Sequence, residues 1–195
     1  MTGRLLLLRH GETEWSAGGR HTGRTDIPLT AAGEAQARAV SGSLAAYRPV
    51  RTLTSPRTRA TDTARLAGCR DVQTLDDLVE WDYGDYEGLT REQIRGRAPQ
   101  WTVWTAPSPG GETAPQVLAR ADRVLDTIRP DLAGGDVLLV SHGHFSRVLA
   151  VRWLDLPLTA AAALHLATAS LCVLGDDRGV PIIEHWNLPN PADRS

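Results

Sequence analysis

Two histidines in the sequence each end a run of aliphatic residues and each precede a glycine. His10 follows the four leucines 5–8 and Arg9, and His142 follows the aliphatic stretch 137–140 and a serine. Such short aliphatic runs indicate strands that are buried on both faces of a sheet. Ligands bind at the carboxyl ends of strands in open α/β sheets, so we expect both imidazoles at one edge of the sheet. An arginine beside a histidine at that edge is suited to bind an anion.

Neither motif is specific on its own, because a buried strand followed by a polar turn gives the same pattern. A further arginine and a carboxylate strengthen the case. Ser55 is expected to cap a helix that begins at Pro56, which places Arg59 near the positive end of that helix. Glu80 precedes a turn-rich aromatic loop. Two histidines, two arginines and one acid are the side chains that a phosphoryl-transfer site requires.

Together these motifs resemble the histidine phosphatase superfamily, in the branch that contains the cofactor-dependent phosphoglycerate mutases. The matching segments occur in the same order over most of the chain: 9–15, 22–23, 26–30, 55–56, 59–60, 78–80, 86–88, 111–113 and 141–143. Within the family, the loop 80–89 and the segment 142–147 are most similar to actinobacterial acid phosphatases. The loop is also similar to that of fungal sedoheptulose-bisphosphatases. Both likenesses imply a phosphatase.

The resemblance implies a reaction through a phosphohistidine. His10 would attack phosphorus through one ring nitrogen while the other donates to a backbone carbonyl group. Glu80 would protonate the leaving oxygen and then activate the water that opens the phosphohistidine. Without the resemblance, Glu80 is a solvated loop carboxylate like its acidic neighbours Asp82, Asp85 and Glu87.

The phosphoryl oxygens would be held by positive charge. Arg9 and Arg59 are suited to this because guanidinium groups pair with phosphate in a bidentate way, and His142 would add a donor. Backbone N–H groups near Thr22, Gly23 and Gly143 are expected to complete this site. Family members often carry asparagine where this chain has Ser16, so Ser16 is expected to reach the phosphate through its shorter hydroxyl or through a water molecule.

The leaving group is expected to meet a rim formed by Arg20, His21, Trp81 and Tyr83. Two further arginines, Arg57 and Arg147, are expected to form ion pairs or to lie on helix surfaces. Trp101 and Trp104 lie in a connection that could act as a lid, although tryptophans in such segments more often anchor packing. We therefore favour packing for both.

Composition limits the partners. The 21 basic and 23 acidic residues give a net charge of -2, which provides no general attraction to nucleic acid or to anionic membranes. A small phosphorylated metabolite is the expected partner, and the resemblance is compatible with a homodimer. No apolar run is long enough to span a bilayer, and the leucines 5–8 are too few for a signal peptide, so we expect a cytoplasmic protein.

We expect no metal ion and no other cofactor. Cys69 and Cys172 are far apart and match no zinc or redox spacing. His142 and His144 could hold a metal ion, but Arg9 and the second arginine of the site argue for an anion instead. The resemblance likewise implies chemistry without metal.

The elements that must position these side chains alternate along the chain. Strands are expected over 5–8, 51–54, 72–75 and 137–140, with a final antiparallel hairpin of 169–174 and 181–185. Helices are expected over 31–46, 56–67, 113–128 and 145–154, with a short helix between Thr90 and Pro99. This order predicts one α/β domain over 1–195, a three-layer α/β/α sandwich with a mostly parallel sheet and helices on both faces. Residues 190–195 are expected to be a loose tail.

Two other functions were weighed against a phosphatase. A phosphoglycerate mutase usually has a longer chain between the Glu80 loop and the 111–113 motif, where only residues 88–111 are available here. A non-catalytic phospho-ligand binding domain would be expected to lack at least one of the five reactive side chains, and all five are present. A phosphatase for small phosphomonoesters or sugar phosphates is therefore the favoured prediction.

Overall fold

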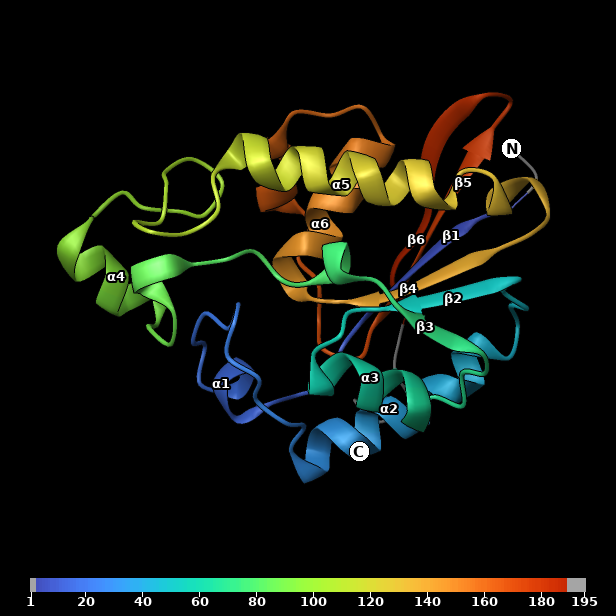
Figure 1. Ribbon diagram of the computed structural model, residues 1–195, viewed down its shortest axis with the longest axis horizontal. Coiled ribbons are helices and arrows are strands. Elements are labelled where there is room, and N and C mark those ends of the chain that lie inside the picture. Colours follow the sequence, from blue (N-terminus) through green and yellow to red (C-terminus); the bar gives the residue numbers. More distant parts are fainter. Residues whose placement is uncertain (1–2, 189–195) are drawn as a thin grey trace.

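A six-stranded sheet forms the centre of the computed structural model, which describes residues 3–188 (Figure 1). The strand order is β3-β2-β4-β1-β5-β6. Four strands are parallel: β1 (Leu5–Arg9), β2 (Arg51–Thr54), β3 (Val72–Thr74) and β4 (Val137–Ser141). The last two, β5 (Leu171–Asp177) and β6 (Val180–Leu188), form an antiparallel hairpin. The expected tail at 190–195 lies outside the described residues.

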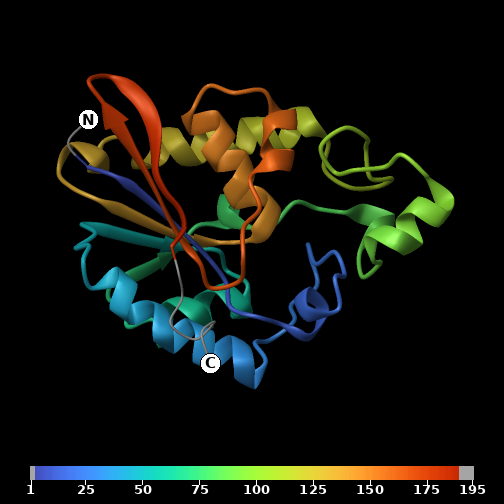
Figure 2. The same cartoon turned by 180° about the vertical axis from the view of Figure 1, so that it is seen from behind.

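Helices cover both faces of the sheet, as Figures 1 and 2 show from opposite sides. One layer contains α2 (Ala31–Leu44) and α3 (Thr58–Leu66), and the other contains α5 (Ala114–Ile128) and α6 (Gly143–Trp153). Side chains alternate along a strand, so Leu6 and Leu8 pack in the first layer while Leu5 and Leu7 pack in the second. The predicted three-layer α/β/α fold with a mostly parallel sheet is confirmed.

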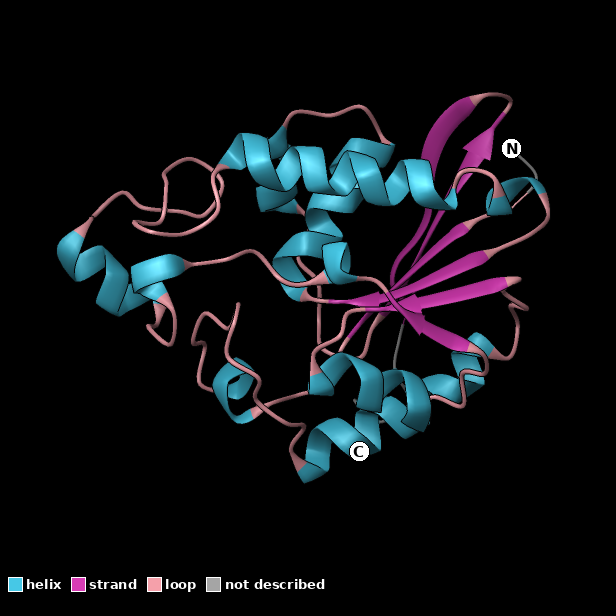
Figure 3. Ribbon diagram, in the orientation of Figure 1, coloured by secondary structure: helices cyan, strands magenta, loops and turns pink. Residues whose placement is uncertain are grey.

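Short elements gather beyond the carboxyl ends of β1 and β4 (Figure 3). They include α1 (Glu14–Ala17) and α4 (Arg91–Arg97), the second of which begins with the predicted capping box of Thr90 and Gln93. Four 3-10 turns occur at Asp76–Leu78, Gly84–Tyr86, Asp131–Ala133 and Leu158–Ala163. Of the helices in residues 3–188, none has the length and apolar character needed to cross a membrane.

The start of α3 differs from the prediction. The helix begins at Thr58, and Arg57 is its N-cap, so Ser55 and Pro56 lie before it. The physical reason is that Asp26 caps this helix from a distant loop, where its carboxylate accepts from the Thr58 N–H at 2.9 Å. The Ser55 hydroxyl accepts from the N–H of the N-cap residue Arg57 at 3.3 Å and also has a partner outside this segment.

Trp101 and Trp104 are both buried in the layer of α5 and α6. The Trp101 indole N–H donates to the Pro107 carbonyl oxygen at 3.2 Å, so this ring is held at both its apolar and its polar side. This placement agrees with the prediction that the two tryptophans anchor packing.

Candidate active site

The pairing of β1 with β4 brings the two predicted histidines together. Arg9 lies opposite Ser141 in the parallel register, and the next residue of each strand is His10 or His142. The two imidazole rings lie with their centroids 5.2 Å apart and nearly edge to face. Sequence segments more than a hundred residues apart therefore meet at the edge where they were expected.

The hydrogen bond of His10 fixes its tautomer. Its Nδ1 lies 2.7 Å from the Gly11 carbonyl oxygen, which can only accept, so Nδ1 carries the proton. The lone pair of the ring is then on Nε2. Burial, together with the positive charges of Arg9 and Arg59, holds the pKa of His10 well below its usual value of 6.5. His10 is therefore a neutral imidazole with a nucleophilic Nε2.

Arg59 and His142 form a fully buried pair next to His10. The Arg59 Nε donates to His142 Nδ1 at 3.2 Å, which leaves the proton of this ring on Nε2. That Nε2 donates to the Ser55 hydroxyl at 2.8 Å. Burial and the Arg59 charge hold the pKa of His142 well below 6.5. To act as the expected phosphate donor, His142 must exchange one of these two bonds for a phosphoryl oxygen.

Ser55, which sequence reasoning assigned to a helix cap, contacts His142 in the structure. Replacing it by alanine is expected to lower kcat/KM by about tenfold, because a buried imidazole loses its acceptor and its fixed orientation. The matched control is Ser146→Ala, since the buried Ser146 hydroxyl has no hydrogen-bond partner in the described chain. Hydrolysis of p-nitrophenyl phosphate by the two variants measures the difference, and equal rates would contradict a role for Ser55.

Arg9 presents a free donor. Its Nη1 donates to the Leu166 carbonyl oxygen at 2.5 Å, but its buried Nε has no partner within residues 3–188. A buried N–H without an acceptor is costly, so an incoming oxygen atom is expected to bind there. Gly143 makes this placement possible, because a Cβ at that position would lie 3.3 Å from the same Nε.

Glu80 is held by the first turn of α6. Its Oε1 accepts from the N–H groups of Trp81 and Phe145 at 2.9 and 2.8 Å, and its Oε2 accepts from the His144 N–H at 3.0 Å. The neighbouring acids have other partners, since Glu87 accepts from Gly23 and Thr25. Two separate backbone segments, at Trp81 and at the start of α6, thus fix the carboxylate of Glu80.

A cavity of about 300 Å³ opens in front of these residues. Of the predicted site residues, those that line it are Arg9, His10, Ser16, Arg20, His21, Thr22, Glu80, Tyr83 and Gly143. Arg147 lines it as well, and its guanidinium lies over the Trp104 ring at 4.4 Å rather than in the ion pair considered for it. Arg59 and His142 lie buried beneath this lining.

Ser16 faces the cavity with an occupied hydroxyl. The Ser16 Oγ donates to the Thr13 carbonyl oxygen at 3.0 Å and accepts from the Thr13 N–H at 2.9 Å, which caps α1. Contact with a phosphate therefore requires a change in these bonds.

Two predicted contacts are absent from this cavity. The Gly23 N–H donates to both oxygens of Glu87, and Gly23 lines a neighbouring cavity instead. Trp81 is only 2% exposed, packs against Trp104, and donates its indole N–H to the Glu112 carbonyl oxygen. Trp81 is thus part of the core rather than the rim, because its apolar ring gains more from packing than from contact with water.

Histidines with lowered pKa values should make stability depend on pH. Burial is the main cause that holds the pKa values of His10, His142 and His144 well below 6.5 in the folded chain. Below about pH 6.5 the unfolded chain therefore binds protons that the folded chain does not. The free energy of unfolding is expected to fall with decreasing pH, by at most about 1.4 kcal/mol per pH unit for each histidine.

Urea denaturation of the ligand-free protein between about pH 7.5 and about pH 5 measures this slope. His10→Asn is expected to make the slope shallower, whereas His185→Asn, at an exposed position of β6, should leave it unchanged. Equal slopes for the two variants would contradict the neutral state of His10.

Residues 5–189 match the model of the histidine phosphatase superfamily, branch 1. An acid phosphatase of Mycobacterium tuberculosis is 47% identical over 180 residues, which cover 91% of this chain and 88% of that protein. The sedoheptulose 1,7-bisphosphatase of Saccharomyces cerevisiae is 35% identical over 189 residues, with coverage of 80% and 69%. A solved structure of an open reading frame from Mycobacterium tuberculosis has a TM-score of 0.93 at 44% identity and covers 97% of this chain and 100% of that one.

Proposed function

The chain belongs to branch 1 of the histidine phosphatase superfamily and is a phosphomonoester hydrolase, and we propose that it hydrolyses sugar phosphates through a phosphohistidine at His10. The observation that carries the proposal is the protonation state and tautomer of His10. A neutral ring with its proton on Nδ1 presents the Nε2 lone pair beside a cavity that is also lined by Arg9, which has an unused N–H donor. A phosphate monoester is a dianion and fits this combination of nucleophile and positive charge.

The reaction has two steps. In the first, His10 Nε2 forms a bond to phosphorus, the bond from phosphorus to the ester oxygen breaks, and Glu80 gives its proton to that oxygen. In the second, Glu80 takes a proton from water, the water oxygen bonds to phosphorus, and the nitrogen–phosphorus bond breaks. Phosphate leaves and His10 returns to its neutral form. The charges of Arg9 and the buried Arg59 stabilise the phosphoryl group in both steps.

The depressed pKa of His10 suits catalysis in acid. An imidazole of ordinary pKa is largely protonated below about pH 6 and cannot attack phosphorus. Burial and the two arginines keep His10 unprotonated at lower pH. This is consistent with the name of the acid phosphatase relative from Mycobacterium tuberculosis.

The cavity also favours a substrate with a second anionic group. Arg20 and Arg91 line it, both are exposed, and neither forms an ion pair within residues 3–188. They come from neighbouring segments, because Arg20 pairs with Thr90 in an isolated β-bridge. A sugar bisphosphate would bring one phosphate to His10 and the other to these arginines. The yeast relative is named for such a substrate.

Arg91→Gln tests this substrate class. We expect KM for fructose or sedoheptulose bisphosphate to rise about tenfold, because one charge-assisted bond is lost, while kcat stays nearly constant. Hydrolysis of p-nitrophenyl phosphate, which has no second anion, should be unchanged. The matched control is Arg95→Gln, about one turn further along the same helix and not a lining residue of the cavity. A similar rise in KM for both substrates would contradict selection of a second anion.

Release of inorganic phosphate from a panel of phosphorylated metabolites, at acidic to neutral pH, tests the function as a whole. Vanadate should inhibit because it imitates five-coordinate phosphorus, and chelators should have no effect. Conversion of 3-phosphoglycerate to 2-phosphoglycerate without phosphate release would instead support a mutase. The cytoplasmic location and a homodimer stay predictions.

A further inference from the structure

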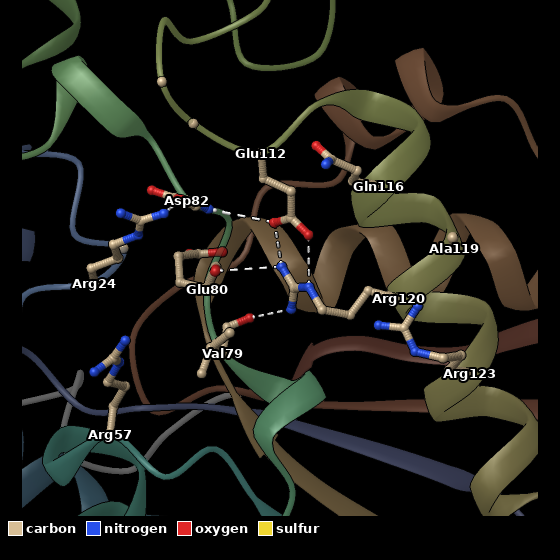
Figure 4. Close-up of a pocket in the computed structure, with 13 residues that line it drawn as sticks. Arg24, Arg57, Val79, Glu80, Asp82, Glu112, Gln116, Ala119, Arg120 and Arg123 are labelled. Atoms are coloured by element: carbon tan, nitrogen blue, oxygen red, sulfur yellow. Dashed lines mark hydrogen bonds and ion pairs between the residues drawn. The ribbon is translucent and has the colours of Figure 1, made fainter.

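A second cavity, of about 550 Å³, lies beside the catalytic one (Figure 4). Within the described chain, Glu80 is the one residue that lines both. In Figure 4, Arg24 and Arg57 approach from one side of the second cavity and Arg120 and Arg123 from the other. We propose that this cavity is a separate, non-catalytic binding site for a phosphorylated anion, with Arg57 as its main ligand.

Two of the four arginines already form bidentate ion pairs with acidic residues of the chain. Arg120 donates to both carboxylate oxygens of Glu112, at 2.8 and 2.6 Å, and to the carbonyl oxygens of Asp77 and Val79. Arg123 forms a bidentate pair with the Asp77 carboxylate at 2.8 and 2.9 Å. These arginines build the wall of the cavity, and their charges are compensated.

Arg57 is different because its charge has no counterpart. The residue is half-buried, its Nε is buried without a hydrogen-bond partner, and its guanidinium forms no ion pair within residues 3–188. The one acid near the start of α3, Asp26, accepts instead from the backbone and side chain of Thr58. A buried donor without an acceptor carries a free-energy cost that a bound oxyanion would remove.

Arg24 can bind the same ligand as Arg57 with only a small loss of folding stability. It pairs with Asp82, but its side chain is 71% exposed, and exposed ion pairs contribute little to stability. A ligand oxygen can therefore replace the Asp82 carboxylate. Glu80 does not compete with such a ligand for Arg24 or Arg57, because its carboxylate accepts from the three N–H groups of Trp81, His144 and Phe145.

Geometry and size define the ligand class. Guanidinium groups bind phosphate in a bidentate way, and the cavity is larger than a single phosphate ion requires. The occupant is therefore a metabolite that carries at least one phosphoryl group. The site is distinct from the catalytic one, because His10 lines the other cavity and not this one.

Isothermal titration of the full chain with methylenediphosphonate, a diphosphate analogue that resists hydrolysis, tests the proposal. Saturating vanadate first occupies the catalytic cavity. We expect one equivalent of the probe to bind to the vanadate-loaded protein. Arg57→Gln should weaken this binding by about tenfold or more, and Arg24→Gln by a smaller factor, because charge-assisted bonds are lost.

The matched control is Arg178→Gln, at an exposed position in the turn between β5 and β6, which should bind the probe like the parent protein. Absence of binding in the presence of vanadate, or equal affinity in Arg57→Gln and Arg178→Gln, would overturn the second site. Thermal melting shows whether each variant is folded. Hydrolysis of p-nitrophenyl phosphate is measured separately, so failure of the second site and failure of the proposed catalytic function are distinguishable.

Discussion

Replacing His10 by alanine is expected to lower kcat/KM for p-nitrophenyl phosphate by about 10⁴-fold or more, since removal of a nucleophile blocks the covalent route altogether. The residual rate would come from the arginines alone, which can bind the ester but cannot form the bond to phosphorus. Denaturation after mixing with radiolabelled substrate should trap labelled protein in the parent and none in His10→Ala. The label should be acid-labile, as a phosphoramidate is.

His185→Ala is the matched control, because this histidine is exposed on β6 and does not line the catalytic cavity. It should retain the parent rate and the trapped label. If His10→Ala hydrolysed the substrate as fast as the parent, His10 would not be the nucleophile. Stoichiometric label in His10→Ala would point to a different residue.

Glu80→Gln is expected to lower kcat/KM for an alkyl phosphate by about 10²- to 10⁴-fold, the range found for general acid–base groups. Glutamine keeps the shape of the side chain, and its oxygen can still accept from the N–H groups of Trp81 and Phe145. Its amide nitrogen cannot accept from the His144 N–H, so one hydrogen bond is lost and thermal melting must show that the variant is folded. It cannot donate a proton to an alkoxide. Steady-state rates with a sugar phosphate, compared with the parent, measure the loss.

A substrate whose leaving group needs no proton tests the two proposed roles of Glu80 separately. p-Nitrophenolate leaves without protonation, so the first step with that substrate should be nearly normal, and a burst of p-nitrophenol should precede slow release of phosphate. Asp85→Asn, at an exposed neighbouring carboxylate, is the control and should behave like the parent. An equal loss in the burst and in the steady state would contradict a role for Glu80 in protonating the leaving oxygen.

The elements that carry the site were predictable because their patterns are strong. Four consecutive leucines followed by a polar turn indicate a strand buried on both faces, and the capping residues Thr90 and Thr113 each precede the expected helix. Parallel strands end at the same edge, so the meeting of His10 and His142 followed from the order of the elements.

The finer contacts were not predictable because they depend on partners remote in sequence. Serine followed by proline is a common helix start, yet here Asp26 caps α3 and Ser55 turns to His142. An aromatic residue in a loop suggests a rim, but Trp81 finds a carbonyl acceptor in Glu112 and becomes buried. The Gly23 N–H was expected to face phosphate and is taken by Glu87 instead.

The residue-for-residue register between β1 and β4 restricts how such a protein can vary. Successive side chains of a strand point to opposite sides, so one amino acid inserted into either strand would rotate its catalytic imidazole away from the other. The connection between α4 and α5 is restricted in another way, because Trp101 and Trp104 are buried and the Pro109 and Glu112 backbone groups bond to the loop of Asp82 and Asp85. Substrate preference can therefore diversify most readily at exposed residues that line the cavity, such as Arg20 and Arg91, while the register of β1 and β4 stays unchanged.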